Sequence, residues 1–201
     1  MRHIVAGTPA APDGRRARSQ SSRAKIVKAM LDLVGGGEMS PSASQVADLA
    51  GVGLRSVYRH FSEIDELYRE MTEAVELQVL PILMRPPQGA TWQQRLFDIA
   101  ARRALIFETI MPYRISANAR RFDSAYLMED YRRMLRLETE ALAAHLPEEV
   151  QEDVAGARGL NVILSFSTWR LLRHDQNLSP EEARAVVERM LGDALARWPE
   201  E

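Results

Sequence analysis

Apolar residues recur every three or four positions from about Ser21 to the end of the chain. Ile26, Met30, Leu33 and Val34, for example, follow the spacing of one face of a helix. No stretch alternates apolar and polar residues over the length of a strand. The pattern therefore predicts an all-α protein of about nine helices.

Two short helices are predicted after the first one. Ser42 can cap one of them, with Gln45 three residues later completing a capping box, and Gly51 can end it. The next helix is expected from about Leu54 to Phe61. Caps and prolines predict six further helices, beginning near Ser62, Thr91, Pro112, Asp123, Pro147 and Ser179.

The later helices carry further signals. Pro81 is expected to kink or end the helix that begins near Ser62, and residues 85–89, Arg-Pro-Pro-Gln-Gly, form the clearest linker. The segment 148–173 is expected to be a single helix with apolar residues on more than one side. Such a helix should be buried on more than one face.

Charge is unevenly distributed along the chain. Residues 1–62 hold nine Lys or Arg and four Asp or Glu, whereas the remainder holds 17 and 24, within a net charge of −2. A basic end on an acidic body is expected where one part meets a polyanion. Chance segregation is the alternative interpretation.

Composition excludes several kinds of chemistry. The chain has no cysteine, which excludes disulfides, zinc–thiolate sites and thiol nucleophiles. Its four histidines show no metal-ligand spacing and there is no glycine-rich phosphate loop, so an enzyme is the less favoured class and no cofactor is expected. The longest apolar run, residues 159–172, is shorter than the ~20 residues of a membrane span. No secretory signal is visible, and we expect a cytoplasmic protein with no membrane partner.

Residues 42–67 have the layout of a helix-turn-helix. Two short helices flank a tight turn, Ala50-Gly51-Val52-Gly53, and the second helix would enter the major groove of DNA. Its outward face would carry Arg and hydroxyl side chains that can bond to bases or phosphates. The alternative is a helical hairpin with a solvated face.

This segment resembles the DNA-binding domain of the TetR/AcrR family of bacterial regulators. Residues 50–61 read AGVGLRSVYRHF, close to the family pattern Ala-Gly-Val-Ser-x-Gly-Thr-Leu-Tyr-x-His-Phe. Further matches lie in the first helix, at Arg23, Ile26, Ala29 and Leu33. The sequence departs from the family pattern at Gly53 (usually Ser), Arg55 (often Gly) and Ile64 (usually a phosphate-binding Lys). These departures suggest an altered operator preference.

The resemblance implies three parts: a flexible basic arm over residues 1–20, a DNA-binding domain over 21–67, and a ligand-sensing and dimerisation domain over 68–201. It implies a repressor that leaves a palindromic operator when an unknown small molecule binds, and phosphate contact for Tyr58 and His60. The DNA-binding candidates are Ser42, Ser44, Leu54, Arg55, Ser56, Tyr58, Arg59, His60, Arg15, Arg16, Arg18 and Arg23. The three arm arginines could enter a minor groove or belong to a tail without a specific role.

Ligand and dimer surfaces are expected in the C-terminal part. The pocket candidates are Phe97, Phe107, Met111, Tyr113, Asn118, Tyr126, Met134, Asn161, Phe166 and Trp169, with ordinary core packing as the alternative for each. The arginine pairs at 102–103, 120–121 and 132–133 are expected on solvated faces, with pairing of one of them to an acidic ligand as the alternative. A homodimer through the last two helices would use Leu160, Ile163, Val186, Val187, Met190, Leu191 and Ala194, unless these residues fill an intramolecular core.

Three rival functions stay open at this stage. An activator, or a regulator without a ligand, would have the same sequence features. A helical interaction module without DNA affinity is a second rival, motivated by Gly53 and Ile64. A small helical enzyme is the third.

Overall fold

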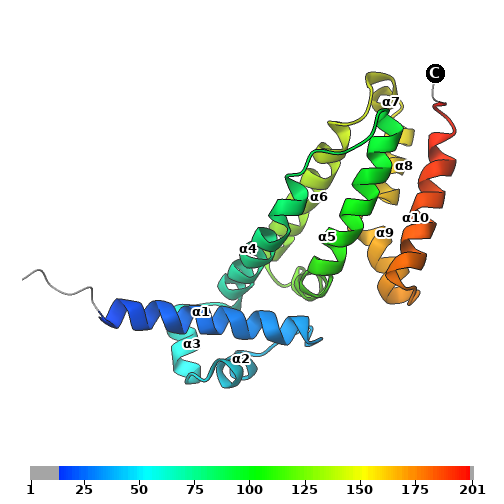
Figure 1. Ribbon diagram of the computed structural model, residues 1–201. Helices are drawn as coiled ribbons and strands as arrows, with labels where there is room; N and C mark the ends of the chain where they lie inside the picture. Colours follow the sequence, from blue (N-terminus) through cyan, green and yellow to red (C-terminus); the bar gives the residue numbers. More distant parts are fainter. Residues whose placement is uncertain (1–13, 200–201) are drawn as a thin grey trace, which may run out of the picture. The chain divides into compact units, whose positions relative to one another are not determined.

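The computed structural model describes residues 14–199, and within them every regular element is a helix. There are ten α-helices and one π-helical turn in this range, so the predicted all-α class is confirmed and the count exceeds the expected nine (Figure 1). Contacts divide the chain after Met71 into an N-terminal and a C-terminal unit. The division falls inside helix α4.

The N-terminal unit consists of three helices and the first turns of a fourth. The bounds are α1 Gly14–Gly35, α2 Ala43–Ala50, α3 Leu54–His60 and α4 Ile64–Leu83, the last continuing into the C-terminal unit. The first three helices contact one another pairwise. Their shared core includes the fully enclosed side chains of Ile26, Met30, Val46, Phe61 and Tyr68. The burial of this apolar surface holds the short helices together.

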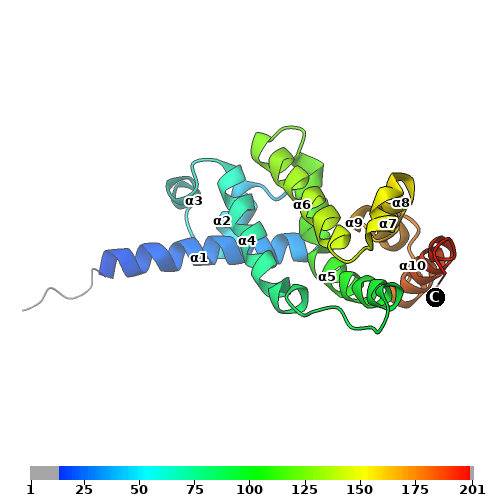
Figure 2. The ribbon, with the colours of Figure 1, turned by 90° about the horizontal axis from the view of Figure 1, so that it is seen from above.

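The C-terminal unit is a helical bundle seen end-on in Figure 2. Its further elements are α5 Trp92–Arg120, α6 Ala125–Ala143, α7 Glu148–Glu152, α8 Val154–Ile163, α9 Phe166–Arg170, the π-helical turn Leu171–Asp175 and α10 Pro180–Leu195. Helix α5 packs against α6, α9 and α10, and α10 also packs against α8. The core between them includes Leu96, Phe107, Leu142, Leu160 and Leu191.

The segment 148–173, expected as one helix, is four shorter elements. The Asp153 carboxylate accepts a hydrogen bond from the Gly156 N–H at 2.9 Å and so starts α8 afresh. The Ser165 hydroxyl does the same for α9 by accepting from the Thr168 N–H at 3.2 Å. Side-chain caps of this kind compete with a continuous helix, and here they turn the chain twice.

Two other boundaries differ from expectation. Helix α5 runs through Pro112, because its packing against α6, α9 and α10 outweighs the loss of one backbone hydrogen bond. Helix α6 is capped by Ser124, not Asp123, with the Ser124 hydroxyl accepting from the Leu127 N–H.

Helix α1 begins inside the segment expected to be a flexible arm. Residues 14–20 are helical, since Arg, Ala and Gln favour helix and extend the turn anchored by the buried stripe of α1. The rest of that arm, residues 1–13, lies outside the described residues, as do the side chains of Arg15 and Arg16.

Gly51 offers a direct test of the turn between α2 and α3. It lies at φ +64°, a left-handed conformation that costs other residues roughly 1–2 kcal/mol, whereas Gly53 has φ −68° and open space where a Cβ atom would lie. We expect Gly51→Ala to lower the free energy of unfolding by about 1–2 kcal/mol. The matched change Gly53→Ala should leave it within about 0.5 kcal/mol or raise it. Urea unfolding followed by circular dichroism measures both, and equal effects of the two changes would contradict the assigned turn.

Candidate functional site

The turn that presents α3 is fixed by local hydrogen bonds. The Ser42 hydroxyl accepts from the Gln45 N–H at 3.2 Å, and the Gln45 amide oxygen accepts from the Ser42 N–H at 2.8 Å. This is the predicted capping box. The Gly51 N–H then bonds back to the carbonyls of Ala47 and Asp48 and ends α2. Helix α3 therefore starts only a few residues after α2 stops.

Helix α3 has one buried and one exposed side. Val57 and the adjoining Phe61 are buried, whereas Leu54, Arg55, Tyr58 and Arg59 are exposed, with 58% of the Tyr58 surface accessible. Ser56 is half-buried, and its hydroxyl accepts a long hydrogen bond of 3.4 Å from Arg59. Gly53 gives α3 no side-chain cap. Helix α3 thus offers two cations, a phenol and uncapped N–H groups to a partner.

The Arg23 guanidinium, predicted to contact DNA, makes several contacts within the N-terminal unit. It donates to the Glu70 carboxylate at 2.6 Å and to the His60 carbonyl at 2.8 Å. It also lies 4.4 Å from the centre of the Phe61 ring, a cation–π distance. Arg23 consequently ties the end of α3 to α1 and to the first turns of α4.

His60 is half-buried, and its ring is poorly placed for the phosphate contact that the resemblance implies. Its Nε2 is enclosed and has no hydrogen-bond partner among the described residues. Burial lowers the pKa of His60, and the positive charges of Arg59 and Arg23 lower it further. The ring is therefore neutral at pH 7. Other DNA-binding candidates, Ser44 and Arg18, are exposed, and Ser42 lies at the surface before α2.

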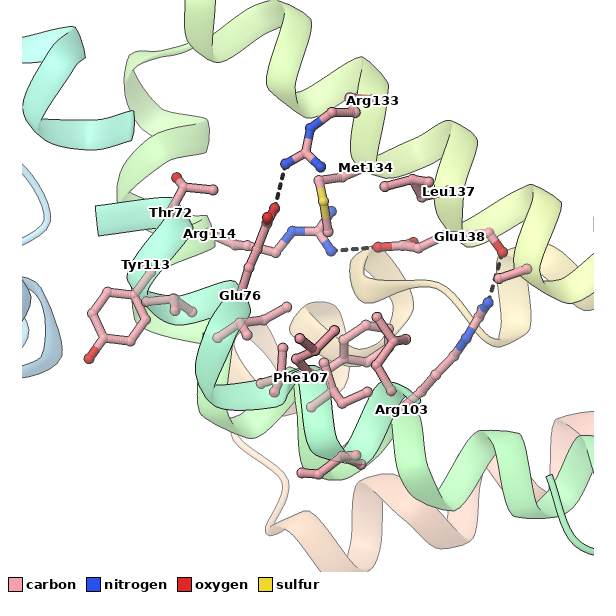
Figure 3. Close-up of a pocket in the computed structure, with 18 of the residues that line it drawn as sticks. Thr72, Glu76, Arg103, Phe107, Tyr113, Arg114, Arg133, Met134, Leu137 and Glu138 are labelled. Atoms are coloured by element: carbon pink, nitrogen blue, oxygen red, sulfur yellow. Dashed lines mark hydrogen bonds and ion pairs between the residues drawn. The ribbon is translucent and has the colours of Figure 1, made fainter. Parts of the chain in front are cut away.

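The C-terminal unit has a partly open cavity of about 510 Å³ between α4, α5 and α6. This volume is within the usual range for small-molecule sites, roughly 300–1,000 Å³. Most of its wall is apolar, from residues such as Val75, Val79, Ile99, Ile106 and Leu137. Figure 3 shows Phe107, Met134 and Leu137 around the same space as several charged side chains.

Four of the ten predicted pocket residues line this cavity: Phe107, Tyr113, Asn118 and Met134. The other six do not, and three of them have other contacts. The Phe166 ring packs edge-on against Phe107 with the ring centres 5.6 Å apart, and the Trp169 indole N–H donates to Glu108 at 2.8 Å. The Asn161 amide donates to the Thr139 hydroxyl at 3.1 Å. The remaining three, Phe97, Met111 and Tyr126, lie outside the lining.

Charged residues of the lining were not among the predicted pocket residues. Arg102, Arg103 and Arg133, expected on solvated faces, all line the cavity, as do Arg114, Glu76 and Glu138. Arg133 pairs with Glu76 of α4 and with Asp130 at 2.7 Å. Arg114 pairs with Glu138 at 2.5 Å across α5 and α6 (Figure 3). The ion pairs of Arg133 with Glu76 and of Arg114 with Glu138 are difficult to predict from the sequence, because the two residues of each pair are far apart along the chain.

The predicted dimer residues divide into two groups. Leu160, Ile163, Val187 and Leu191 are buried within the C-terminal unit itself, which is the alternative left open for them. Val186 and Ala194 are half-buried, and Met190 is exposed. Val162 of α8 and Leu171 of the π-helical turn are exposed apolar residues that were not among the predicted dimer residues.

Two negative findings concern residues 14–199. None of the helices in this range combines the length and the apolar character that crossing a membrane requires. The same range holds no group of three or more His, Cys, Asp or Glu side chains placed to bind a metal ion.

Comparisons with known proteins identify the fold. No family model and no curated protein matches the chain. A transcriptional regulator from Rhodococcus sp. RHA1 superposes with a TM-score of 0.64 at 20% identity, covering 87% of this chain and 96% of that one. The multidrug binding protein EbrR, complexed with imidazole, superposes with a TM-score of 0.58 at 19% identity, covering 89% and 90%. A TetR transcriptional regulator from the same Rhodococcus, at a TM-score of 0.48 and 14% identity over 90% and 99%, matches too loosely to support an argument. The chain therefore shares its fold with the Rhodococcus regulator of the first comparison and with EbrR.

Proposed function

We propose that this chain is a TetR/AcrR-type regulator that binds a palindromic DNA operator as a homodimer and is released by a small molecule bound in the cavity. The observation that supports it best is α3, a seven-residue helix with Arg55, Tyr58 and Arg59 exposed after a tight turn. In a helix-turn-helix, such side chains at the start of the second helix reach base edges. The resemblance of residues 50–61 to the family pattern points the same way.

Three exposed side chains of α3 have a role in this proposal. Arg55 can form two hydrogen bonds to a guanine edge. Tyr58 and Arg59 contact phosphates and fix the register of the helix on the duplex. Arg23 acts as a positioning residue, since its bonds to Glu70 and to the His60 carbonyl hold the end of α3. The candidates Ser42 and Ser44 lie at the start of α2, where they can contact backbone phosphates.

Helix α4 supplies the route from ligand to DNA in this proposal. Its first turns belong to the N-terminal unit, where Leu67 and Tyr68 are buried, and its later turns line the cavity with Val75 and Val79. A ligand that favours one position of α4 over another changes the population of the operator-binding state by its difference in affinity for the two.

The DNA-binding proposal is tested by changes on α3. We expect Arg55→Ala to weaken binding to an operator, selected first from a random DNA pool, by roughly thirtyfold or more, because the homodimer loses one base contact at each half-site and each contact is worth about 1–3 kcal/mol. Arg59→Ala should weaken binding to all sequences alike and reduce the slope of log affinity against log salt by about 2, because each subunit loses one phosphate contact. Fluorescence anisotropy over a salt series measures both.

The matched control for these changes is Arg136→Ala. Arg136 is exposed on α6 and pairs with Glu129, so its removal changes the net charge equally but should leave the affinity for DNA unchanged. Full-strength DNA binding by the Arg55→Ala and Tyr58→Ala proteins would contradict the proposal and favour a helical interaction module.

The homodimer is proposed to form through the exposed parts of α8 and α10, with Val162 and Met190 in the contact. We expect Val162→Glu to yield monomers in sedimentation velocity, because a carboxylate would lose its water in an apolar interface. Operator affinity should fall with it, since one α3 contacts too few base pairs. Leu105→Glu on α5 is the control, because Leu105 and Val162 are similarly exposed, at 58% and 60%. A dimer that survives Val162→Glu but not Leu105→Glu would move the interface to α5.

A further inference from the structure

We propose that the cavity takes an amphiphile with an apolar body and a single anionic head, carboxylate or phosphate. This inference rests on the proposed function and deepens it by naming the chemical class of the effector. It follows from an imbalance of charge among the side chains between α5 and α6.

Three guanidinium groups line the α5 wall of the cavity, from Arg102, Arg103 and Arg114. Two carboxylates oppose them: Glu138 pairs with Arg114 at 2.5 Å, and Asp98 lies 2.9 Å from Arg102. The Arg103 guanidinium donates to backbone carbonyls, of Leu164 at 2.9 Å and of Glu138 at 2.7 Å. This group of five side chains, the basic group, therefore has one positive charge in excess.

Burial makes this excess charge significant. The side chains of Arg114 and Glu138 are only 13% and 11% exposed, and that of Arg102 is 9% exposed. Figure 3 shows Arg114 and Arg103 reaching Glu138 from two sides, one toward its carboxylate and the other toward its backbone. Charges in such a site are weakly screened, so an uncompensated cation is costly until an anion arrives.

A further observation agrees with a positive potential at this end of the cavity. His145 also lines the cavity, and burial together with the charges of Arg102, Arg95 and Arg103 lowers its pKa. The imidazole is therefore neutral and available as a hydrogen-bond donor to an anion.

A second charged group, at Glu76, Asp130 and Arg133, has the opposite imbalance, two carboxylates against one guanidinium. It favours a cationic ligand, so the two groups compete to select the head. Glu76 and Arg133 are 42% and 40% exposed and Asp130 is 13% exposed, so solvent and salt screen two of the three charges in this group. The basic group, whose charges are less screened, therefore determines which head group is preferred. The apolar residues between the two groups contact the body of the ligand.

The test compares ligands that share a ten-carbon chain and differ in the head. Titration calorimetry of the full-length protein without DNA would use decanoate, decyl phosphate, decan-1-ol and decyltrimethylammonium below their aggregation thresholds. We expect one or both anions to bind at least tenfold more tightly than the alcohol, because hydrogen bonds to a charged group are roughly twice as strong as neutral ones. A preference between the two anions distinguishes a carboxylate from a phosphate ligand. Equal binding of the alcohol, or preference for the ammonium, would overturn the inference.

Two variants test where the anionic head of the ligand binds. Arg103→Gln should remove most of the preference for the anions over the alcohol while the affinity for the alcohol stays within about threefold. Arg136→Gln is the control, since Arg136 is exposed on α6, pairs with Glu129 and does not line the cavity. If the Arg103→Gln protein does not fold, a second measurement on the unaltered protein tests the same point. It follows the pKa of His145 by NMR as ligand is added. Decanoate should raise that pKa and decan-1-ol should leave it low; no difference between them would place the head elsewhere and overturn the inference.

The outcomes separate this inference from the proposed function. Binding of all four ligands with no head preference overturns the anionic class alone. Binding of none, with operator binding intact, overturns the ligand class and the effector part of the function, and leaves the DNA-binding part standing. Anion-selective binding that does not alter the operator complex confirms the ligand class and overturns its role as the releasing effector.

Discussion

The exposed surface of α3 depends on how firmly a helix of seven residues is held from behind. A helix this short is unstable alone, because its few backbone hydrogen bonds do not offset the conformational entropy lost in forming the first turn. Val57 and Phe61 supply the apolar contact, and the Arg23 guanidinium lies over the Phe61 ring while it bonds to Glu70 and to the last carbonyl of α3. A side chain on α1 thus fixes both the position and the end of the helix that is proposed to read DNA.

The helix-turn-helix could be predicted well from the sequence because the signals for it are local. The capping box of Ser42 and Gln45 spans three residues, and the left-handed turn needs only Gly51 itself. The exposed side of α3 then follows from helical spacing. By contrast, the role of Arg23 depends on Glu70, 47 residues away, and no pattern within one helix reveals such a pair.

Prediction of the cavity was poorer for the same reason. Phe166 and Trp169 have the composition expected of a pocket, but Phe107 and Glu108 of α5 engage them from across the bundle. Arg102 and Arg103 look like solvated cations in sequence, yet one is buried beside Asp98 and the other reaches the carbonyls of Glu138 and Leu164. Apolar spacing alone also missed the breaks at Asp153 and Ser165, where one capping side chain outweighed a continuous apolar pattern.

The contacts that α4 makes in the C-terminal unit determine which residues a proposed effector would have to contact. The pair of Glu76 with Arg133 ties α4 to α6, and a pair this exposed contributes about 0–1 kcal/mol. The apolar contacts of Val75 and Val79 face the cavity itself, so their strength depends on what fills it. A ligand bound by the basic group alone would have equal affinity for every position of α4 and would shift no population. The anionic head can therefore supply affinity and selectivity, but regulation requires an apolar body long enough to reach α4.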